Sequence, residues 1–368
     1  MVTNILGKNL IINNLYYSSV IRGIYTPKAR LLTVLLGGSV DRIPVTSIAG
    51  CSGTVNVEMQ DYAGIYWPEA HKDPEKMAKL AIVSYMMSGL ECVRVPFDMV
   101  VEAEAFGCKI KWFEARDSVP MVASHPYNIS SKLNIPNDIL SRGRIPTILN
   151  AIRFLRRKVG SFLPISSSAL GPFTLAGELT GIERLLIQCV KNLRQVIEFI
   201  NGIEEFIIDY CRSQYRAGSD IIVIVEPSAS SDLISPKMFR DIVKPSLIRI
   251  ASELKGFKIL HICGNTSLII KDMAECGYHG VSISNSVNIR MTKILMGKTK
   301  LLGGISTKTL LLGSPENIRE AVREAINAGI DIVEPECGIP PNTPLINIKS
   351  LVEETVSYSN IRGPPLIL

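Results

Sequence analysis

The feature that most constrains the fold of this chain is a series of eight short apolar runs, separated by stretches with helical character. Short runs rich in β-branched residues are typical of strands that are buried on both faces of a parallel sheet. Eight strand–helix units predict an α/β fold of the (β/α)8 TIM-barrel type. An open doubly wound sheet is the alternative, but no helix begins with Gly-x-Gly-x-x-Gly. The eight runs are residues 43–49, 91–97, 163–169, 220–226, 258–263, 280–284, 300–305 and 329–334.

Four stretches between the runs are predicted to be helices. Three of them begin with a capping Asp or Ser followed by proline, which is favoured at the first helical position. Glycines at the ends of three are expected to adopt the left-handed conformation that terminates a helix. The helices are residues 74–88, 235–254, 267–276 and 314–328; the cap pairs are Asp73-Pro74, Ser235-Pro236 and Ser314-Pro315; and the glycines are Gly256, Gly277 and Gly329.

Two connections are longer than one barrel helix requires. Residues 99–161 contain four prolines and are expected to form a lid or a side extension. Residues 173–219 are expected to form two or three helices. Because both segments follow predicted strands, these extra segments should lie on loops at the C-terminal face, where barrel enzymes carry their active sites.

Composition limits the compartment and the partners. The 368 residues are 46% apolar and 20% charged, and the net charge of +6 is spread without a block of basic and aromatic residues, so nucleic acid is not an expected partner. No run of 18 apolar residues occurs, and residues 1–28 lack the features of a signal peptide, so no membrane segment is expected. The eight cysteines show no paired spacing, and most lie in apolar stretches, as expected for buried thiols of a cytoplasmic protein.

Three potential metal ligands lie at the ends of predicted strands. His261 and Cys263 occur in His-Ile-Cys-Gly, and Cys337 follows the last run in Glu-Cys-Gly. Alternate residues of a strand face the same side, so His261 and Cys263 should point together, with Cys337 at the same end of the barrel. One imidazole and two thiolates make a zinc site with one open position, as in catalytic zinc sites. The alternative is that they are small core residues.

The remaining histidines have simpler explanations. His71 and His125 lie in polar contexts, at a helix start and in a loop, which predicts exposed surface positions. His279 is expected in a turn before the sixth strand.

A site with these ligands suits alkyl transfer to sulfur better than hydrolysis. Coordination removes the proton of a bound thiol and leaves a thiolate at neutral pH, which attacks an activated methyl carbon. Hydrolytic zinc sites rely on His and carboxylate ligands with an adjacent carboxylate base. Glu334 and Glu336 flank the last strand end, but the sequence does not tell which way they point.

Three acidic residues are further catalytic candidates. Asp98 and Glu226 end the second and fourth predicted strands, and Glu104 follows the second. Buried carboxylates at strand ends require partners, which favours a functional role. The alternative for Glu104 is an ordinary carboxylate on a helix face. Arg94, inside the second strand, is expected to pair with one of these acids rather than to hold an anionic substrate group.

Many segments resemble the uroporphyrinogen decarboxylase superfamily, and within it the methylcobamide:coenzyme M methyltransferases. The resemblance extends from about residue 28 to residue 358. It implies a single TIM-barrel domain over residues 28–368, preceded by an N-terminal extension, residues 1–27, that has no counterpart. The matching segments are LLTVLLGGSVDRIPV, WPEAHKDPEKMAKLA, LECVRVPFDMVVEAEAFGC, GPFTLAGELTG, AGSDIIVIVEPSAS, ILHICGNT, ISTKTLLLGSPE and ECGIPPNTPLINIKSLV.

The resemblance also implies a function and its cofactors. Members of this group bind Zn²⁺ through residues that correspond to His261, Cys263 and Cys337. The implied reaction is methyl transfer from a methylated corrinoid (cobalamin) protein to a small thiol such as coenzyme M (2-mercaptoethanesulfonate), in methanogenesis from methylated compounds. The chain contains no Asp-x-His-x-x-Gly corrinoid motif, so the corrinoid is expected on a separate partner protein. A monomer and a homodimer are both compatible with the sequence.

Two departures from the family pattern keep other functions open. Ser284 and Asn285 stand where acidic residues are usual, and Gly304 stands where asparagine is usual. One alternative is a tetrapyrrole decarboxylase, although residues 43–60 lack the arginines that such an enzyme uses after its first strand. The other is a non-catalytic barrel that binds a corrinoid or a protein.

Overall fold

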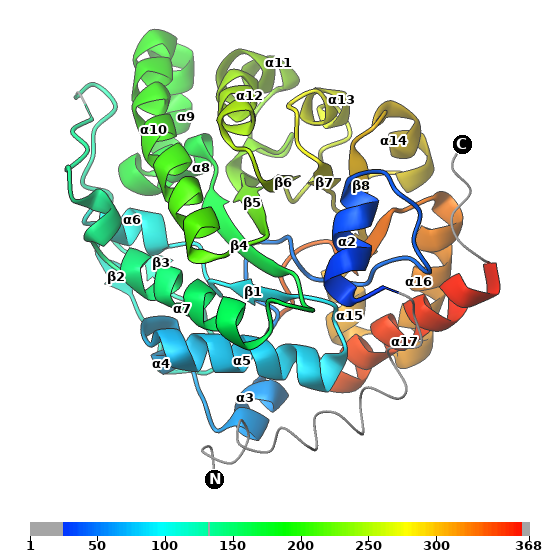
Figure 1. Cartoon of the computed structure of the whole chain (residues 1–368). Coiled ribbons are helices and arrows are strands. Elements are labelled where there is room, and N and C mark those ends of the chain that lie inside the picture. The colour runs from blue at the N-terminus through cyan, green and yellow to red at the C-terminus, as the bar shows by residue number, and fades with distance from the viewer. Residues whose placement is uncertain (1–24, 132, 363–368) are drawn as a thin grey trace.

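A curved sheet of seven parallel strands forms the centre of the protein in the computed structural model (Figure 1). The structure describes residues 25–131 and 133–362, so most of the expected N-terminal extension, residues 1–24, lies outside them. Each strand pairs with the next along the sheet, in chain order. The strands are β1 (Val93–Val95), β4 (Ile165–Leu170), β5 (Ile221–Val225), β6 (Phe257–His261), β7 (Gly280–Ser282), β8 (Lys300–Ile305) and β9 (Ile332–Pro335).

The first predicted strand, residues 43–49, is not a regular strand. Val45 makes one isolated parallel bridge to Val333 of β9. The N–H of Thr46 donates to the carbonyl of Val333 at 2.9 Å, and the N–H of Glu91 donates to the carbonyl of Val45 at 2.9 Å. The segment therefore contacts both β9 and the residues before β1. The fold is TIM-barrel-like, with seven regular strands in the central sheet where the sequence predicted eight.

Side chains accept hydrogen bonds from backbone N–H groups that a regular strand would donate to its neighbour. Three N–H groups of this segment donate to buried side chains instead of to a neighbouring strand, and Pro44 has no N–H to donate. The segment is therefore irregular, but these backbone N–H groups still have hydrogen-bond partners. The donor–acceptor pairs are Val45 N to Glu91 Oε2 (3.3 Å), Ser47 N to Cys92 Sγ (3.4 Å) and Ile48 N to Glu334 Oε2 (3.2 Å).

Helices cover the outer face of the sheet (Figure 1). Parallel strands require such crossover connections, and the amphipathic stretches of the sequence supply them. The covering helices are α5 (Pro74–Ser88), α7 (Ile145–Lys158), α10 (Leu193–Ala217), α12 (Lys244–Glu253), α13 (Ile270–Ala274), α14 (Ile289–Leu295), α16 (Pro315–Ala328) and α17 (Leu345–Arg362).

The sheet separates two apolar cores. Ile222 and Ile224 of β5 belong to the large core between sheet and helices. Val223, the residue between them, belongs to a smaller inner core that includes Leu31 of α2 (Pro27–Leu35). Alternate residues of one strand thus face opposite sides, as the strand period requires. Because α2 packs against the inner face near the start of β5, it covers the end of the barrel opposite the strand carboxyl ends.

The predicted helices at 74–88 and 314–328 are confirmed as α5 and α16, and both begin with the predicted side-chain caps. Residues 235–254 are instead divided into α11 (Pro236–Met238), a π-helical turn (Phe239–Val243) and α12, and the helix at 267–276 is shortened to α13.

The expected helix stops are confirmed at two of three glycines. Gly277 and Gly329 have φ of 85° and 97°. Gly256 does not adopt a positive φ. A Cβ there would lie 2.3 Å from the ring of Tyr215, so close packing explains this glycine instead.

Residues 99–161 form a side extension rather than a lid over the pocket described below. They contain a short helix, a two-stranded hairpin and a 3₁₀ turn before α7. Residues 173–219 fall in three helices, which agrees with the predicted two or three. These elements are α6 (Val101–Ala105), β2 (Ile110–Lys111), β3 (Met121–Val122), η2 (Ile139–Ser141), α8 (Pro172–Thr180), α9 (Ile182–Lys191) and α10; the other short helices are α3 (Val57–Ala63), α4 (Glu69–Lys72), η3 (Pro227–Ala229) and α15 (Thr307–Leu312).

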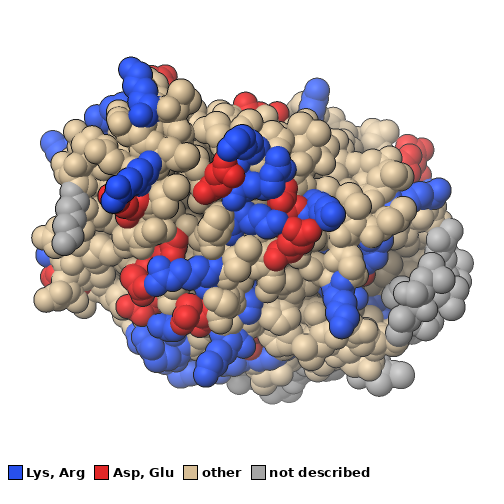
Figure 2. Space-filling model, turned by 90° about the horizontal axis from the view of Figure 1, so that it is seen from above, with Lys and Arg blue, Asp and Glu red and all other residues tan. Residues whose placement is uncertain are grey.

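The surface charges are mixed in sign. On the face seen in Figure 2, Lys and Arg are largely interspersed with Asp and Glu. Ion pairs such as Lys244 with Asp272 connect neighbouring helices. Within the described part of the chain, no helix is both long enough and apolar enough to cross a membrane.

Candidate metal centre

The centre is built on the carboxyl end of β6. His261 is the last residue of this strand and is fully buried. Its Nδ1 lies 3.1 Å from the hydroxyl oxygen of Ser282 on β7, which leaves Nε2 facing the cluster. Cys263 follows two residues later and is half-buried. The strand therefore presents the imidazole and the thiol at one place, as predicted.

Cys337 comes to the same place from β9, two residues beyond the end of that strand. The neighbouring Glu336 fixes this turn. Its carboxylate accepts the N–H of Asn285 at 2.7 Å and the N–H of Thr307 at 3.0 Å. Glu336 thus joins the ends of β7, β8 and β9.

Cys51 completes the cluster and was missed by the sequence analysis. One potential ligand atom from each of Cys51, His261, Cys263 and Cys337 lies within 4.8 Å of all the others. Residue 51 comes two positions after the end of the first apolar run, in Gly-Cys-Ser-Gly. Like Cys263 and Cys337, it is a soft ligand close to the end of an apolar run, but Ser52 rather than glycine follows it directly, so it lacks the full pattern that identified the other two cysteines.

Arg94 holds the loop that carries Cys51. Its guanidinium donates to the carbonyls of Ala49 (3.1 Å), Ser52 (2.6 Å) and Gly50. The expectation that Arg94 pairs with an acid is therefore wrong, because backbone carbonyls occupy its donors. Burial lowers the pKa of Arg94, and the nearby thiols and Glu334 oppose this shift.

The Cys51 and Cys337 loops are packed directly against each other. A Cβ at Gly50 (φ 118°) would lie 2.3 Å from the backbone nitrogen of Gly338, and a Cβ at Gly338 would lie 2.1 Å from Ser52 Oγ. The N–H of Cys51 also donates to Cys337 Sγ at 3.3 Å. Only glycine allows this approach of two backbones.

The four residues of the cluster shift one another's pKa values. Burial lowers the pKa of His261, but interactions with Cys263 and Cys337 outweigh burial and raise it to about 9. Hydrogen bonds from Cys263 and Cys51, together with His261, hold the pKa of Cys337 well below its usual range. Hydrogen bonds with Cys263 and Cys337, together with burial, raise the pKa of Cys51.

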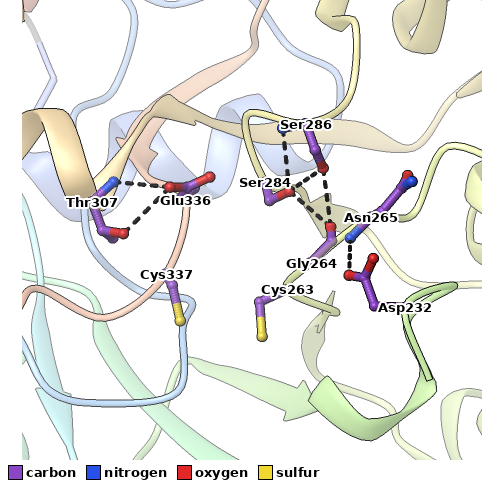
Figure 3. Close-up of a pocket in the computed structure, with 9 residues that line it drawn as sticks. All are labelled: Asp232, Cys263, Gly264, Asn265, Ser284, Ser286, Thr307, Glu336 and Cys337. Carbon is purple, nitrogen blue, oxygen red and sulfur yellow. Dashed lines mark hydrogen bonds between the residues drawn. The ribbon is translucent and has the colours of Figure 1, made fainter.

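A pocket of about 400 Å³ opens beside the two strand-end thiols. Figure 3 shows Cys263 and Cys337 pointing to the same side, with polar side chains around the rest of the wall. Ser284 is hydrogen-bonded to the carbonyl of Gly264 at 2.7 Å. The lining residues are Asp232, Cys263, Gly264, Asn265, Ser284, Ser286, Thr307, Glu336 and Cys337.

Asp98 and Glu104 lie outside this lining and belong to an ion-pair cluster. Asp98 accepts two bonds from Arg144, at 2.8 and 2.9 Å, and Glu104 accepts one from the same guanidinium at 2.7 Å. His71 Nδ1 lies 2.7 Å from Asp98, and its ring is fully buried. The prediction of an exposed His71 is therefore wrong, because its ring packs on Trp67. His125 is exposed as predicted.

Glu226 also lies outside the pocket lining. Its carboxylate accepts the N–H groups of Phe173 (3.0 Å) and Thr174 (2.6 Å) at the start of α8. Burial raises the pKa of Glu226 to about 7, although those hydrogen bonds lower it. A Cβ at Gly171 would lie 2.2 Å from Glu226 Oε2, which explains that glycine. The geometry gives Asp98, Glu104 and Glu226 structural partners, and their catalytic roles stay predictions.

Glu334 lies behind the cluster. Its Oε2 accepts the hydroxyl of Thr46 at 3.1 Å and the N–H of Ile48 at 3.2 Å. Burial raises the pKa of Glu334, and His261 lowers it. This carboxylate thus positions the segment that leads to Cys51.

Comparison with known proteins identifies the family. The family description for uroporphyrinogen decarboxylase (URO-D) matches residues 26–358. The chain belongs to the uroporphyrinogen decarboxylase family. This URO-D match includes the seven strands and all four residues of the cluster.

Within the URO-D family, the chain groups with methyltransferases. A methylcobamide:CoM methyltransferase of Methanosarcina barkeri is 39% identical over 339 residues, which cover 91% of this chain and 98% of the relative. The solved structure of a methyltransferase from Methanosarcina mazei is 39% identical, with a TM-score of 0.87 and coverage of 91% and 99%. A uroporphyrinogen decarboxylase of Thermus thermophilus is 25% identical over 300 residues, covering 78% and 85%. The resemblance seen in the sequence is confirmed.

Proposed function

We propose that this protein transfers a methyl group from a methylated corrinoid, carried by a separate protein, to a small thiol such as coenzyme M, in methanogenesis from methylated compounds. The observation that carries this proposal is the convergence of His261, Cys263 and Cys337 beside the pocket. The reaction class agrees with the name of the Methanosarcina barkeri relative, a methylcobamide:CoM methyltransferase.

The side chains present fit a zinc ion. Zn²⁺ prefers thiolate and imidazole ligands, and it is bound in tetrahedral geometry. His261 is oriented for this role by Ser282, in the way that a second hydrogen bond fixes the ring of most metal-binding histidines. When bound, zinc lowers the pKa of an acceptor thiol so that it is a thiolate at neutral pH.

The pocket is suited to the acceptor. Its volume of about 400 Å³ lies within the range of small-ligand sites. Cys263 and Cys337 belong both to the cluster and to the pocket wall, so an acceptor in the pocket brings its sulfur to the cluster. Asn265, Ser286 and Thr307 are available to contact the rest of the acceptor.

The proposed reaction is a direct displacement. The acceptor sulfur attacks the methyl carbon, a carbon–sulfur bond forms, and the carbon–cobalt bond breaks with its electron pair remaining on cobalt. The thiol proton is lost before attack. Proximity is the main contribution of the protein, because a thiolate and a methyl donor held in contact gain a large effective molarity. The corrinoid is larger than the acceptor and is expected to remain on its carrier protein, docked over the pocket.

The first prediction is the activity itself. Zinc-loaded protein is mixed with methylcobalamin and a panel of small thiols, and loss of the methyl–cobalt absorbance is followed. We expect demethylation that depends on zinc and prefers 2-mercaptoethanesulfonate. Equal rates with every thiol, or no reaction with any, would contradict this assignment.

The decarboxylase alternative is less well supported. Relatives with that name are less similar, as the Thermus thermophilus protein shows. A cluster of one imidazole and three thiols has no evident use in decarboxylation. The non-catalytic alternative was suggested partly by Gly304, and the structure gives this glycine (φ 98°) a packing reason, since a Cβ would lie 2.7 Å from Ala325 Cβ. Protein without affinity for zinc would favour either alternative.

A further inference from the structure

Cys51 lies at the distances expected for a ligand of the same metal ion. Its Sγ is 3.6 Å from Cys263 Sγ and 3.8 Å from His261 Nε2. Sulfur and nitrogen ligands about 2.3 and 2.1 Å from a tetrahedral zinc ion are about 3.6 to 3.8 Å from each other. Cys51 therefore stands where a fourth ligand would be needed, in a cluster whose four potential ligand atoms all lie within 4.8 Å of one another.

We infer that Cys51 is a fourth, exchangeable ligand, which closes the centre at rest and leaves it when the acceptor thiol binds. This inference rests on the proposed function. A centre with four protein ligands is typical of structural zinc, whereas catalysis requires a free position. Exchange of Cys51 reconciles the four-residue cluster with a thiol-activating role.

The resting position of Cys51 is built into the fold. Arg94 fixes the loop through three carbonyls, and the close contact of Gly50 with Gly338 fixes it against the Cys337 loop. Both constraints act on the backbone. The side chain of Cys51 therefore reaches the cluster without substrate, and it can leave by rotation about its own χ1.

Cys51 is the ligand best suited to leave. His261 lies within the β6 ladder and is bonded to Ser282, and Cys337 Sγ accepts a backbone N–H. The side-chain contacts found for Cys51 Sγ are with members of the cluster itself. Cys263 and Cys337 form the pocket wall, and Cys51 is not among the residues that line it. Losing Cys51 thus preserves the wall against which the acceptor binds.

The exchange balances without a separate base. The acceptor thiol gives up its proton as its sulfur becomes a ligand, and the departing thiolate of Cys51 takes up that proton. One metal–sulfur bond forms and one breaks, so the net charge of the centre is unchanged. The two carboxylates of the pocket, Asp232 and Glu336, already accept the backbone N–H groups of Asn265 and Asn285. Neither is required as a base.

The test uses zinc K-edge X-ray absorption with a selenium-containing acceptor, 2-selenoethanesulfonate. Selenium and sulfur neighbours of zinc are distinguishable, so ligand loss and acceptor binding are counted separately. Full-length protein is compared with Cys51→Ala and with Cys189→Ala, a matched change at a cysteine of α9 outside the cluster. Each sample is measured with and without the selenol.

The expected results differ between variants. Wild-type protein and Cys189→Ala should show three sulfur neighbours at rest, and two sulfurs plus one selenium with the acceptor. Cys51→Ala should show two sulfurs throughout and gain the selenium. Two sulfurs in resting wild type, or three that persist after selenium binds, would overturn the inference. Absence of selenium binding in wild type, with no demethylation of methylcobalamin, would instead overturn the proposed function.

Discussion

At the residue scale, the centre depends on side chains that are not among the proposed metal ligands. Ser282 orients His261, Glu336 fixes the turn before Cys337, and Arg94 fixes the loop of Cys51. Arg94 is buried, and its two terminal nitrogens donate to carbonyl oxygens, while its Nε has no hydrogen-bond partner. A buried guanidinium is costly unless its donors are used. Its position is therefore explained by the loop that it holds.

Replacement of Arg94 by methionine tests this role. Arg94→Met keeps most of the side-chain volume but leaves the carbonyls of Ala49, Gly50 and Ser52 without their donor. We expect the free energy of unfolding to fall by about 3 kcal/mol, and zinc affinity to fall by about 10- to 100-fold, as for other residues that orient ligands. Urea unfolding and zinc competition with a chelator measure the two effects. Arg153→Met, at an exposed position of α7, should change neither.

The residues of the centre were only partly predictable. His261 ends a regular strand and Cys263 follows it by two residues, so the strand period predicted that they point together, and Cys337 was placed at the same end of the barrel because it follows the last strand. Cys51 follows a segment whose backbone donors bind side chains, and no periodicity describes such a loop. The burial of His71 could not be derived either, because its partner Asp98 is brought to it only by the fold.

At the scale of elements, an ion-pair cluster joins the segment after β1 to the start of α7. Asp98 accepts two bonds from Arg144 and contacts His71, and all three side chains are buried. Burial raises the pKa of Asp98, but Arg144 and His71 lower it more, to well below its usual range. These contacts give Asp98 a structural role, which is to anchor the side extension to the barrel. Its catalytic role stays a prediction.

The pH dependence of stability follows from this shift. A carboxylate whose pKa is lower in the folded state stabilises the protein above its unfolded pKa of about 3.9. That contribution is lost as the pH falls below about 4, toward the folded pKa. We expect Asp98→Asn to lower the free energy of unfolding by about 3 kcal/mol at pH 7, because it leaves Arg144 partly unpaired. Urea titrations between pH 7 and about pH 3 should show a smaller acid loss in Asp98→Asn than in wild type.

The exposed residue Asp209 on α10 provides the control for this measurement. Asp209→Asn should retain the full acid loss of wild type, since its partner Arg212 is 3.6 Å away at the surface. An acid loss of equal size in Asp98→Asn would show that other carboxylates cause it.

The strands and helices followed from the sequence more closely than the connections did. Seven apolar runs became strands because both faces of each are buried. Residues 43–49 are also apolar, but they include Pro44, which has no N–H group. The N–H groups of Val45 and Ile48 donate to the carboxylates of Glu91 and Glu334. Where a backbone hydrogen bond has a side-chain competitor, composition alone does not decide between strand and loop.

At the scale of the molecule, the fold should not depend on the metal. The proposed ligands lie on a barrel-like fold with a large outer core and a smaller inner core, whereas small zinc domains require the ion to fold. We expect chelated protein and Cys337→Ala to keep the native far-UV circular dichroism and cooperative unfolding, while losing zinc and methyl transfer. Full zinc content with full activity in Cys337→Ala would show that the ligand assignment is wrong, and unfolding on chelation would make the ion structural.

The contact between the N–H of Cys51 and Cys337 Sγ joins positions that are 286 residues apart in the chain. At a synthesis rate of about 5–20 residues per second, Cys337 is added to the chain many seconds after Cys51. Until β9 has emerged and paired with β8, the nascent chain holds an incomplete set of ligands. We therefore expect the proposed metal to be loaded late in the biogenesis of this protein, after β9 has joined the sheet.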